Sequence, residues 1–378
     1  MNFLAVLKVV NMNIKLEVVD RDLIVTLPAE AKALSMTVHG GGFKRNLKYV
    51  VFHEVPHDFN NNPKEECKSV LKKLNLDPNK SAVFLTAVRV SEMYVSIEGA
   101  YEGVKCSVTA TVGLNNPVSI PPNSISSLPS TINILAIVDK DVPFSGLVEL
   151  VKVVADARAS ALHDVDLRCN LKYAIGTSTD AFIVASLGYK PTQPYTGPAT
   201  PVGKLVSQLV YRAVMEGAEK AGFSPGRSMI RRLEERGVEL KDIIEAALDL
   251  FIPWSGLDVD EARSIIEREL ISCLNDINVS SFISAALRLD EDAKLGLIPN
   301  LTPEQYLQDP VHLVVDEILG LSLAIYLNGW NAVFELYRYD TKKPGILSKL
   351  TPFLDDIIAA LIAGVTSRIY SKFIKKAS

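Results

Sequence analysis

The spacing of apolar residues changes character once along this 378-residue chain. Up to about residue 200, strand-like runs such as "SAVFLTAVRV" and "TINILAIVD" alternate with helical segments. After the segment "AGFSPGRS" (221–228) only helical spacing is found. Because Gly, Pro and Ser interrupt regular structure, we place a domain boundary there. The pattern predicts an α+β domain (1–221) with a layered sheet and helices, a linker (222–228), and an all-α helical bundle (229–378).

The expected elements follow from this spacing. The first strand is expected at "FLAVLKVV", near the start of the chain, and the last at "AFIVASL". The helices expected in the first domain occupy 63–74, 144–163 and 200–221. Those expected in the second occupy 229–236, 240–250, 259–277, 282–287, 310–327 and 352–374.

Composition narrows the class of protein. The net charge is −4 and no basic stretch is interleaved with aromatic residues, so a nucleic-acid partner is not expected. The four cysteines have no CxxC spacing, which favours reduced thiols in the cytoplasm over a zinc site or disulfides. The most apolar runs are shorter than the ~20 residues that cross a bilayer, so no membrane span is expected. A homo-oligomer stays open.

Two adjacent pairs of acids lie within apolar helical segments. "LTPFLDDIIAALIAG" contains Asp355 and Asp356, and "DPVHLVVDEILGLSLAIYL" contains Asp316 and Glu317. One explanation is the helix dipole, which stabilises acids in a first turn by roughly 0.3–1 kcal/mol. However, Asp316 and Glu317 lie about two turns into the helix expected from residue 310, where the dipole contributes little.

The alternative explanation is a metal site. Small residues follow each acidic pair at helical spacing, so the two helices are expected to pack closely. The carboxylates of Asp316, Glu317, Asp355 and Asp356 would then repel one another unless a cation joins them, and oxygen ligands suit Mg²⁺ or Mn²⁺. Glu269 lies on the apolar face of its helix and is a further candidate ligand, although a Glu whose carboxylate reaches solvent is the commoner explanation of such a position.

The segment between these helices, "FELYRYDTKKPGIL" (334–347), brings Arg338, Asp340 and Lys343 into an expected short connection. Cations beside a carboxylate-bound metal suit hydrolysis of a phosphate monoester, because they offset charge on the transferring group. The competing interpretation is a solvated loop whose charges pair with one another.

The first domain contains a polar turn between two strand-like runs, "AIGTSTDAFIVASL". The hydroxyls of Thr177, Ser178 and Thr179 with the carboxylate of Asp180 are suited to holding a carbonyl oxygen and a water. A purely structural turn has the same composition. Asn115, Asn116 and Asn133 lie at expected strand ends, where an amide either binds a polar ligand or caps the backbone.

The order DE-x-x-G, F-x-x-x-R-x-D-x-x-K-P and DD-x-x-A resembles the phosphatidylglycerophosphatase A superfamily, and most of all its soluble archaeal branch, the α-ribazole-phosphate phosphatases. The resemblance covers about 229–370. The spacing between Arg and Asp is one residue shorter than in the bacterial lipid phosphatases, which argues against a lipid substrate. The resemblance implies metal- and phosphate-binding roles for Asp316, Glu317, Asp340, Lys343, Asp355 and Asp356, with Arg338 as a nearby substrate contact.

The segments "FLTAVRVSEM", "GTSTDA" and "YTGPATPVGKL" resemble the adenosylcobinamide amidohydrolases over about 39–219. This implies amide hydrolysis, with Asp180 as base or orienting residue and Thr177, Thr179, Asn115 and Asn133 as candidate catalytic or substrate contacts. The resemblance supplies neither a nucleophile nor a cofactor for this half. "DAR" (156–158) stands where the family usually has an EAK-like triplet.

Together the two resemblances are similar to fused archaeal enzymes of cobalamin salvage. They imply corrinoid and nucleotide-like small-molecule substrates: the aminopropanol amide of adenosylcobinamide for the first half, and α-ribazole 5′-phosphate or adenosylcobalamin phosphate for the second. Mg²⁺ or Mn²⁺ would serve the second half. A corrinoid-binding module fused to a phosphatase for another sugar phosphate, or for phosphatidylglycerophosphate, stays as the alternative.

Overall fold

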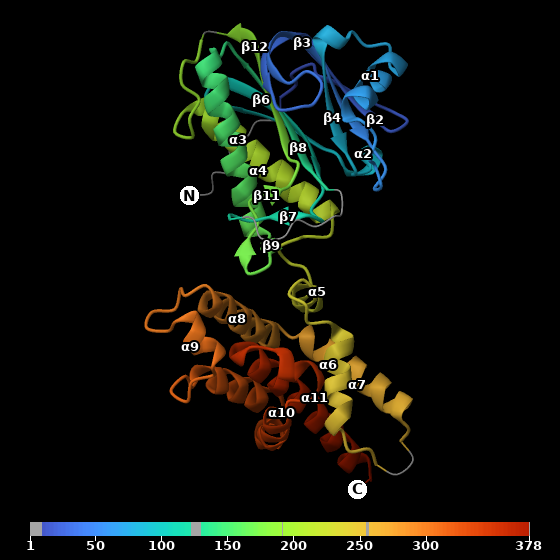
Figure 1. The fold of residues 1–378 in the computed structure, drawn as a ribbon, viewed down its shortest axis with the longest axis vertical. Helices are drawn as coiled ribbons and strands as arrows, with labels where there is room; N and C mark the ends of the chain where they lie inside the picture. Colours follow the sequence, from blue (N-terminus) through green and yellow to red (C-terminus); the bar gives the residue numbers. More distant parts are fainter. Residues whose placement is uncertain (1–9, 122–129, 191, 255–256, 378) are drawn as a thin grey trace. The chain divides into compact units, whose positions relative to one another are not determined.

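The computed structural model describes residues 10–121, 130–190, 192–254 and 257–377 (Figure 1). The chain divides into two compact units, Met1–Pro225 and Gly226–Ser378. This division falls inside the segment 222–228. The strand expected at "FLAVLKVV" lies almost entirely outside the described residues.

The first unit is built on one mixed sheet with the strand order β4-β3-β2-β12-β8-β6-β5, and β1 adds to β2. The pairs β3–β4 and β8–β12 are parallel, and the other pairs are antiparallel. The strands are β1 Lys15–Val19, β2 Asp22–Ser35, β3 Gly42–Glu54, β4 Ser81–Thr86, β5 Val95–Tyr101, β6 Val104–Val112, β8 Ile132–Lys140 and β12 Ala181–Lys190.

Helices and short ladders complete this unit. The helices are α1 Pro63–Lys73, α2 Val90–Met93, α3 Phe144–Asp164 and α4 Pro201–Lys220. Two short antiparallel ladders join β7 Pro117–Val118 to β11 Gly176–Thr177, and β9 Arg168–Cys169 to β10 Lys172–Tyr173.

The two faces of the sheet are buried in different ways. Alternate residues of β8, such as Ile134 and Ala136, join a core with α3 and α4, which lie across that face (Figure 1). Leu135 and Ile137 point to the opposite face, where they pack with side chains of β2, β3 and β4 such as Phe84. The sheet also bends, because β4 and β8, which are distant in its order, contact each other directly.

One side-chain hydrogen bond shows the extent of this bending. The Asn133 Nδ2 atom at the start of β8 donates to the Leu85 carbonyl near the end of β4, at 3.0 Å. Three strands, β3, β2 and β12, separate β4 from β8 in the sheet order. The bend thus brings the end of β4 to the beginnings of β8 and β12, and the polar residues at these ends face one hollow.

The second unit is entirely helical among its described residues, as predicted. Its elements are α5 Met229–Glu234, α6 Leu240–Leu250, α7 Val259–Leu274, α8 Ile277–Lys294, α9 Pro303–Leu307, α10 Val315–Lys342, the 3₁₀ helix η3 Gly345–Lys349, and α11 Pro352–Ala377. Helices α6, α7, α8 and α10 pack around α11 (Figure 1). The apolar residues of α11 from Ile357 to Val365 are consequently inaccessible to solvent.

Helix α10 differs from the sequence prediction in both extent and shape. It includes 334–342, which was expected to be a connecting loop, so only Lys343 and Pro344 separate it from η3. It also breaks at Asn328 and Gly329, where Gly329 has a φ of 59° that favours glycine. The hydrophobic spacing of 330–339 is helical in retrospect, with Ala332, Leu336 and Tyr339 buried on one side.

Helix α11 is longer than its most apolar run suggested. The segment 352–374 has the length and hydropathy of a membrane span, and α7 with α8 passes the same test only as a pair bent by 82°. Length and composition do not separate a membrane span from a core helix. Because most of α11 is covered by α6, α7, α8 and α10, its apolar character is accounted for by packing within the unit.

Candidate functional sites

The two acidic pairs of the second unit both lie at helix beginnings. Helix α11 begins at Pro352 after Thr351, as its sequence predicts. Helix α10 begins at Val315, so Asp316 and Glu317 are in its first turn, and the prediction that they lie two turns in is wrong. Residues 310–313 form a separate turn instead, closed by the Leu313 N–H donating to the Pro310 carbonyl at 2.8 Å. Asp316, Glu317 and Asp355 therefore lie in first turns, where the helix dipole favours negative charge, and Asp356 follows directly after the first turn of α11.

Small residues allow these two helix beginnings to meet, as predicted. A Cβ atom placed on Gly320 of α10 would lie 3.2 Å from the Asp356 carbonyl oxygen of α11. A Cβ atom on Gly364 of α11 would lie 2.2 Å from a side-chain carbon of Leu327. A larger residue at either position would separate the helices, and with them the acids that they carry.

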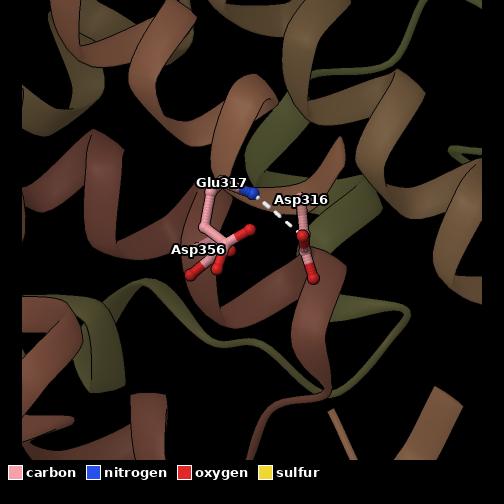
Figure 2. Close-up of side chains that lie close together, drawn as sticks. All are labelled: Asp316, Glu317 and Asp356. Carbon is pink, nitrogen blue, oxygen red and sulfur yellow. Dashed lines mark hydrogen bonds between the residues drawn. The ribbon is translucent and has the colours of Figure 1, made fainter. Parts of the chain in front are cut away.

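Three carboxylates gather at this junction, from α10 and α11 (Figure 2). One carboxylate oxygen of each of Asp316, Glu317 and Asp356 lies within 4.8 Å of the others. Asp316 is 2% exposed and Asp356 is 8% exposed, whereas Glu317 reaches solvent. Burial, followed by hydrogen bonding to Glu317, raises the pKa of Asp316 to about 7. Burial, followed by repulsion from Asp355 and other acids, raises the pKa of Asp356 to about 8.

The donor set of this cluster fits a divalent cation. All three groups offer carboxylate oxygens, which are the ligands that Mg²⁺ and Mn²⁺ prefer. Two of them are so buried that without a counter-charge they hold protons near neutral pH. The residues present therefore match the metal that the sequence predicts.

Asp355 lies beside this cluster and has a different partner. It forms an ion pair with Lys343, while its Oδ1 atom is buried without a hydrogen-bond partner among the described residues. Burial raises the pKa of Asp355 to about 6, against the opposing effect of Lys343. Lys343 ends α10 in the left-handed region (φ 41°), and its Nζ atom is 3.8 Å from Asp340. The structure thus brings three of the four predicted ligands together and places Asp355, paired with Lys343, beside them.

Two residues predicted for this site lie elsewhere. Glu269 is bound by Lys372, with Nζ–Oε distances of 2.6 and 2.7 Å. Lys372 is sixteen positions after Asp356 on α11, which is roughly 24 Å along the helix. Arg338 donates to Glu335 at 2.6 Å and to the Leu250 carbonyl at 2.8 Å. Both predictions are corrected: these side chains are held by other partners, away from the carboxylate cluster.

The first unit contains a cavity of about 490 Å³ at the ends of β2, β4, β8 and β12. Its mouth includes the apolar residues Met36 and Val38, which are 53% and 51% exposed. Its polar lining comprises Thr37, Thr86, Asn116, Ser130, Thr131, Asn133, Ser178, Thr179 and Asp180. An apolar entrance with convergent polar groups inside is typical of a small-molecule site.

Asp180 organises the turn beside this cavity. Its Oδ1 atom accepts from the Ile132 N–H at 2.9 Å and from the Thr177 hydroxyl, and its Oδ2 atom accepts from the Thr177 N–H at 3.0 Å and from Arg158. A Cβ atom on Gly176 would lie 2.3 Å from Oδ2, so this close approach requires glycine. With its oxygens engaged by these donors, the carboxylate is placed to orient the turn rather than to take a proton from a substrate.

The other predicted residues of this half divide into two groups. Thr179 and Asn133 line the cavity, where Thr179 donates to the Ser130 carbonyl at 3.2 Å. Thr177 is not among the lining residues, because its hydroxyl is directed to Asp180. Asn115 is exposed and outside the cavity, and its neighbour Asn116 lines it instead.

Several lining residues were missed by sequence reasoning. Ser130 and Thr131 come just before β8, and Thr86 ends β4. Their common signal is a hydroxyl at a strand end, which becomes informative only once the sheet order shows which ends meet.

Comparison with known proteins identifies both halves. Residues 9–223 match the family model described as adenosylcobinamide amidohydrolase, and residues 264–371 match the one described as phosphatidylglycerophosphatase A. An adenosylcobinamide amidohydrolase of Halobacterium salinarum is 35% identical over 118 residues, which are 29% of this chain and 48% of that relative, about half its length.

Two other similarities each cover more than a third of the chain. An uncharacterized protein of Methanocaldococcus jannaschii is 36% identical over 131 residues, which are 34% of this chain and 99% of that relative. The crystal structure of the low temperature requirement C protein from Listeria monocytogenes is 31% identical, covers 38% of this chain and 93% of its own, and has a TM-score of 0.34.

Proposed function

Because the chain belongs to the adenosylcobinamide amidohydrolase family and carries a phosphatidylglycerophosphatase A-like domain after it, we propose that it is a bifunctional hydrolase of cobalamin salvage. The first unit would hydrolyse the aminopropanol amide of adenosylcobinamide to adenosylcobyric acid. The second would remove phosphate from α-ribazole 5′-phosphate. The presence of both domains on one chain is the observation that carries this proposal, since the two products serve the same synthesis.

In the first unit, the proposal rests on the polar lining of the cavity. The hydroxyls of Ser130 and Ser178, which accept hydrogen bonds from the Asn115 N–H and the Asn116 amide, offer donors for an amide carbonyl, whose oxygen gains negative charge during hydrolysis. Asp180 holds the turn that carries Ser178 and Thr179, so the donors are fixed before substrate arrives.

In the second unit, the proposal rests on the junction of α10 and α11. A divalent cation held by Asp316, Glu317 and Asp356 would supply the charge that polarises phosphate and lowers the pKa of water. Lys343, held by Asp355, adds a compact positive charge beside it. Together these groups favour a phosphate monoester.

The buried thiols bear on the location of the protein. All four cysteines are free and buried, as expected where thiols stay reduced. We therefore propose a cytoplasmic protein.

The substrate of the second unit is tested by comparing phosphate release from α-ribazole 5′-phosphate, adenosylcobalamin phosphate, ribose 5-phosphate and phosphatidylglycerophosphate. We expect kcat/KM with Mg²⁺ to be at least ~10-fold higher for α-ribazole 5′-phosphate than for ribose 5-phosphate, because base contacts add binding energy. Equal values for the two would indicate a general sugar phosphatase. A preference for phosphatidylglycerophosphate would contradict the proposal.

The first unit is tested by the release of aminopropanol from adenosylcobinamide. If the protein binds the corrinoid without releasing aminopropanol, the first unit is a binding module and the amidohydrolase assignment fails.

A further inference from the structure

Asn116 lies in the lining of the cavity of the first unit with only one end of its amide bound. Its side chain is 4% exposed. The Nδ2 atom donates to the Ser178 hydroxyl at 2.9 Å. The Oδ1 atom is buried and has no hydrogen-bond partner among the described residues. Buried polar atoms in native proteins are nearly all paired, so this oxygen requires an explanation.

The local backbone fixes the position of this amide. Asn116 precedes Pro117, which restricts its backbone to extended conformations. Pro117 begins β7 and pairs with Thr177 of β11, the residue before Ser178. The same short ladder therefore holds Asn116 and the hydroxyl that orients it, so the unpaired oxygen is held in place before a ligand arrives.

The chemistry of the oxygen defines its partner. A side-chain carbonyl only accepts hydrogen bonds, so a ligand that pairs with this oxygen must donate an N–H or O–H group to it. The other side-chain amide of the lining, on Asn133, is already engaged: it donates to the Leu85 carbonyl, and its Oδ1 atom lies 3.4 Å from the Thr131 hydroxyl. Among the described lining residues, Asn116 is thus the side-chain amide whose oxygen is left without a partner.

We propose that Asn116 Oδ1 accepts the N–H of a secondary amide on the substrate and thereby selects the amide over the acid formed from it. The inference rests on the proposed amide hydrolysis. In that reaction the acyl C–N bond breaks, the oxygen of water bonds to the acyl carbon, and the protons of water pass to the amine, which leaves as an ammonium ion when the acid is ionised. The carboxylate product has no N–H, and its charge faces the Asn116 oxygen, so binding of the product is weakened.

The size of the cavity indicates which part of the substrate reaches Asn116. About 490 Å³ accommodates a drug-sized group, which is less than a complete corrinoid with its side chains and axial ligands. The amide-bearing arm fits inside, while the corrin ring remains at the mouth against Met36 and Val38. Selection at Asn116 therefore acts on the arm and not on the ring.

The test compares the affinities of cobinamide and cobyric acid, which share the ring and differ in the arm, by equilibrium dialysis with detection of corrin absorbance. Asn116→Leu conserves volume and removes the acceptor, and Asn116→Asp keeps an acceptor. Asn115→Leu, at the exposed neighbour, is the matched control. We expect Asn116→Leu to reduce the preference for cobinamide roughly 5- to 150-fold, since one buried hydrogen bond is lost. The Asn115→Leu and Asn116→Asp variants should keep a preference for cobinamide.

Melting temperature and KM separate this role from a structural one. If Asn116→Leu melts like the wild type and raises KM for adenosylcobinamide, the inference stands. If it keeps the wild-type preference for cobinamide, or weakens both corrinoids equally, the inference is overturned. If Asn116→Leu does not fold, Ser178→Ala is measured instead. This substitution removes the hydroxyl to which the Asn116 amide donates, and it should reduce the preference for cobinamide.

The outcome is distinguishable from failure of the proposed function. A wild-type protein that prefers cobinamide without releasing aminopropanol, and loses this preference in Asn116→Leu, supports the inference and rejects the amidohydrolase activity. A protein that releases aminopropanol while Asn116→Leu retains the preference supports the activity and rejects the inference.

Discussion

Replacing Asp356 with Asn is expected to slow phosphate release at least ~10²-fold and to stabilise the metal-free protein. Asp356 is a predicted metal ligand, 8% exposed, and burial with nearby acids raises its pKa to about 8. Without a cation, an ionised carboxylate there opposes folding. Asparagine removes the charge and keeps the size. A shift of one pKa unit corresponds to about 1.4 kcal/mol, so after discounting for relaxation and entry of water we expect a gain on the order of 2 kcal/mol at pH 8.

The same carboxylates determine how stability depends on pH. In the folded protein the pKa values of Asp355, Asp316 and Asp356 are about 6, 7 and 8, all above the ordinary 3.8. The folded state therefore binds protons more tightly than the unfolded chain. Protonation of these carboxylates stabilises the folded state fully below pH ~4, and this stabilisation is lost as pH rises through 6 to 8. Denaturation measured in the presence of a chelator should show this loss of stability. Added Mg²⁺ should restore most of the lost stability above pH 7.

The control for this prediction is Asp260→Asn. Asp260 is an exposed acid in the first turn of α7, so it represents an acid whose interaction with the helix dipole is not combined with burial. Its replacement should cost roughly 0.3–1 kcal/mol with or without Mg²⁺. If Asp356→Asn behaves like Asp260→Asn, and chelation changes neither activity nor stability, the carboxylate cluster is not a metal site.

Asp180→Asn is expected to reduce amide hydrolysis by ~10² or more and to destabilise the first unit by about 3–5 kcal/mol. The carboxylate pairs with Arg158, and the side chains of both are largely buried, at 6% and 12% exposed. It also accepts from the backbone N–H groups of Ile132 and Thr177. Removing its charge leaves the Arg158 guanidinium buried without a counter-ion and loosens the turn beside the cavity.

Denaturation and activity measured on three variants test the role of Asp180. Adding Arg158→Met to Asp180→Asn should recover part of the stability and none of the activity, since the uncompensated charge is removed but the turn stays loose. Asp156→Asn is the control, because Asp156 forms an exposed pair with Lys152 and should change stability by less than ~1 kcal/mol. If Asp180→Asn keeps wild-type stability and only its pH–rate profile changes, Asp180 is a general base and not an orienting residue.

Hydrophobic spacing was sufficient to predict most strands and helices, because each element has a face to bury. It was not sufficient to predict how the sheet bends. The contact between Asn133 and Leu85 joins two strands that are distant in the sheet order, and no local pattern encodes it. The cavity consequently could not be placed before the strand order was known, although Asn133, Thr179 and Asp180 were identified as candidates.

Helix starts show a similar limit. A capping residue followed by proline occurs before both acid-bearing helices, yet only Thr351–Pro352 begins a helix directly. At Asp309–Pro310, Asp309 adopts a positive φ of 49° and the following residues close a turn, which delays α10 to Val315. The same local signal therefore predicts a helix nearby without fixing its first residue.

Partners of single side chains were the least predictable. Helical spacing correctly placed Glu269 on the inner side of its helix, but its partner Lys372 lies 103 residues away. Near the cavity, a strand-end position did not distinguish exposed Asn115, which was chosen as a substrate contact, from buried Asn116, which lines the cavity. Both cases depend on contacts between distant segments, which spacing within one segment does not specify.

The central claim, two separate hydrolytic sites on one chain of which the second depends on a metal, is tested by a single measurement. The full-length protein is given adenosylcobinamide and α-ribazole 5′-phosphate together, and aminopropanol and phosphate are quantified with Mg²⁺ and with EDTA. We predict that both products form with Mg²⁺ and that EDTA stops phosphate release alone, since the described cavity residues of the first unit include one carboxylate, Asp180, whose oxygens are already bound. Phosphate release that is unaffected by EDTA, or the absence of either product with Mg²⁺, would contradict the account.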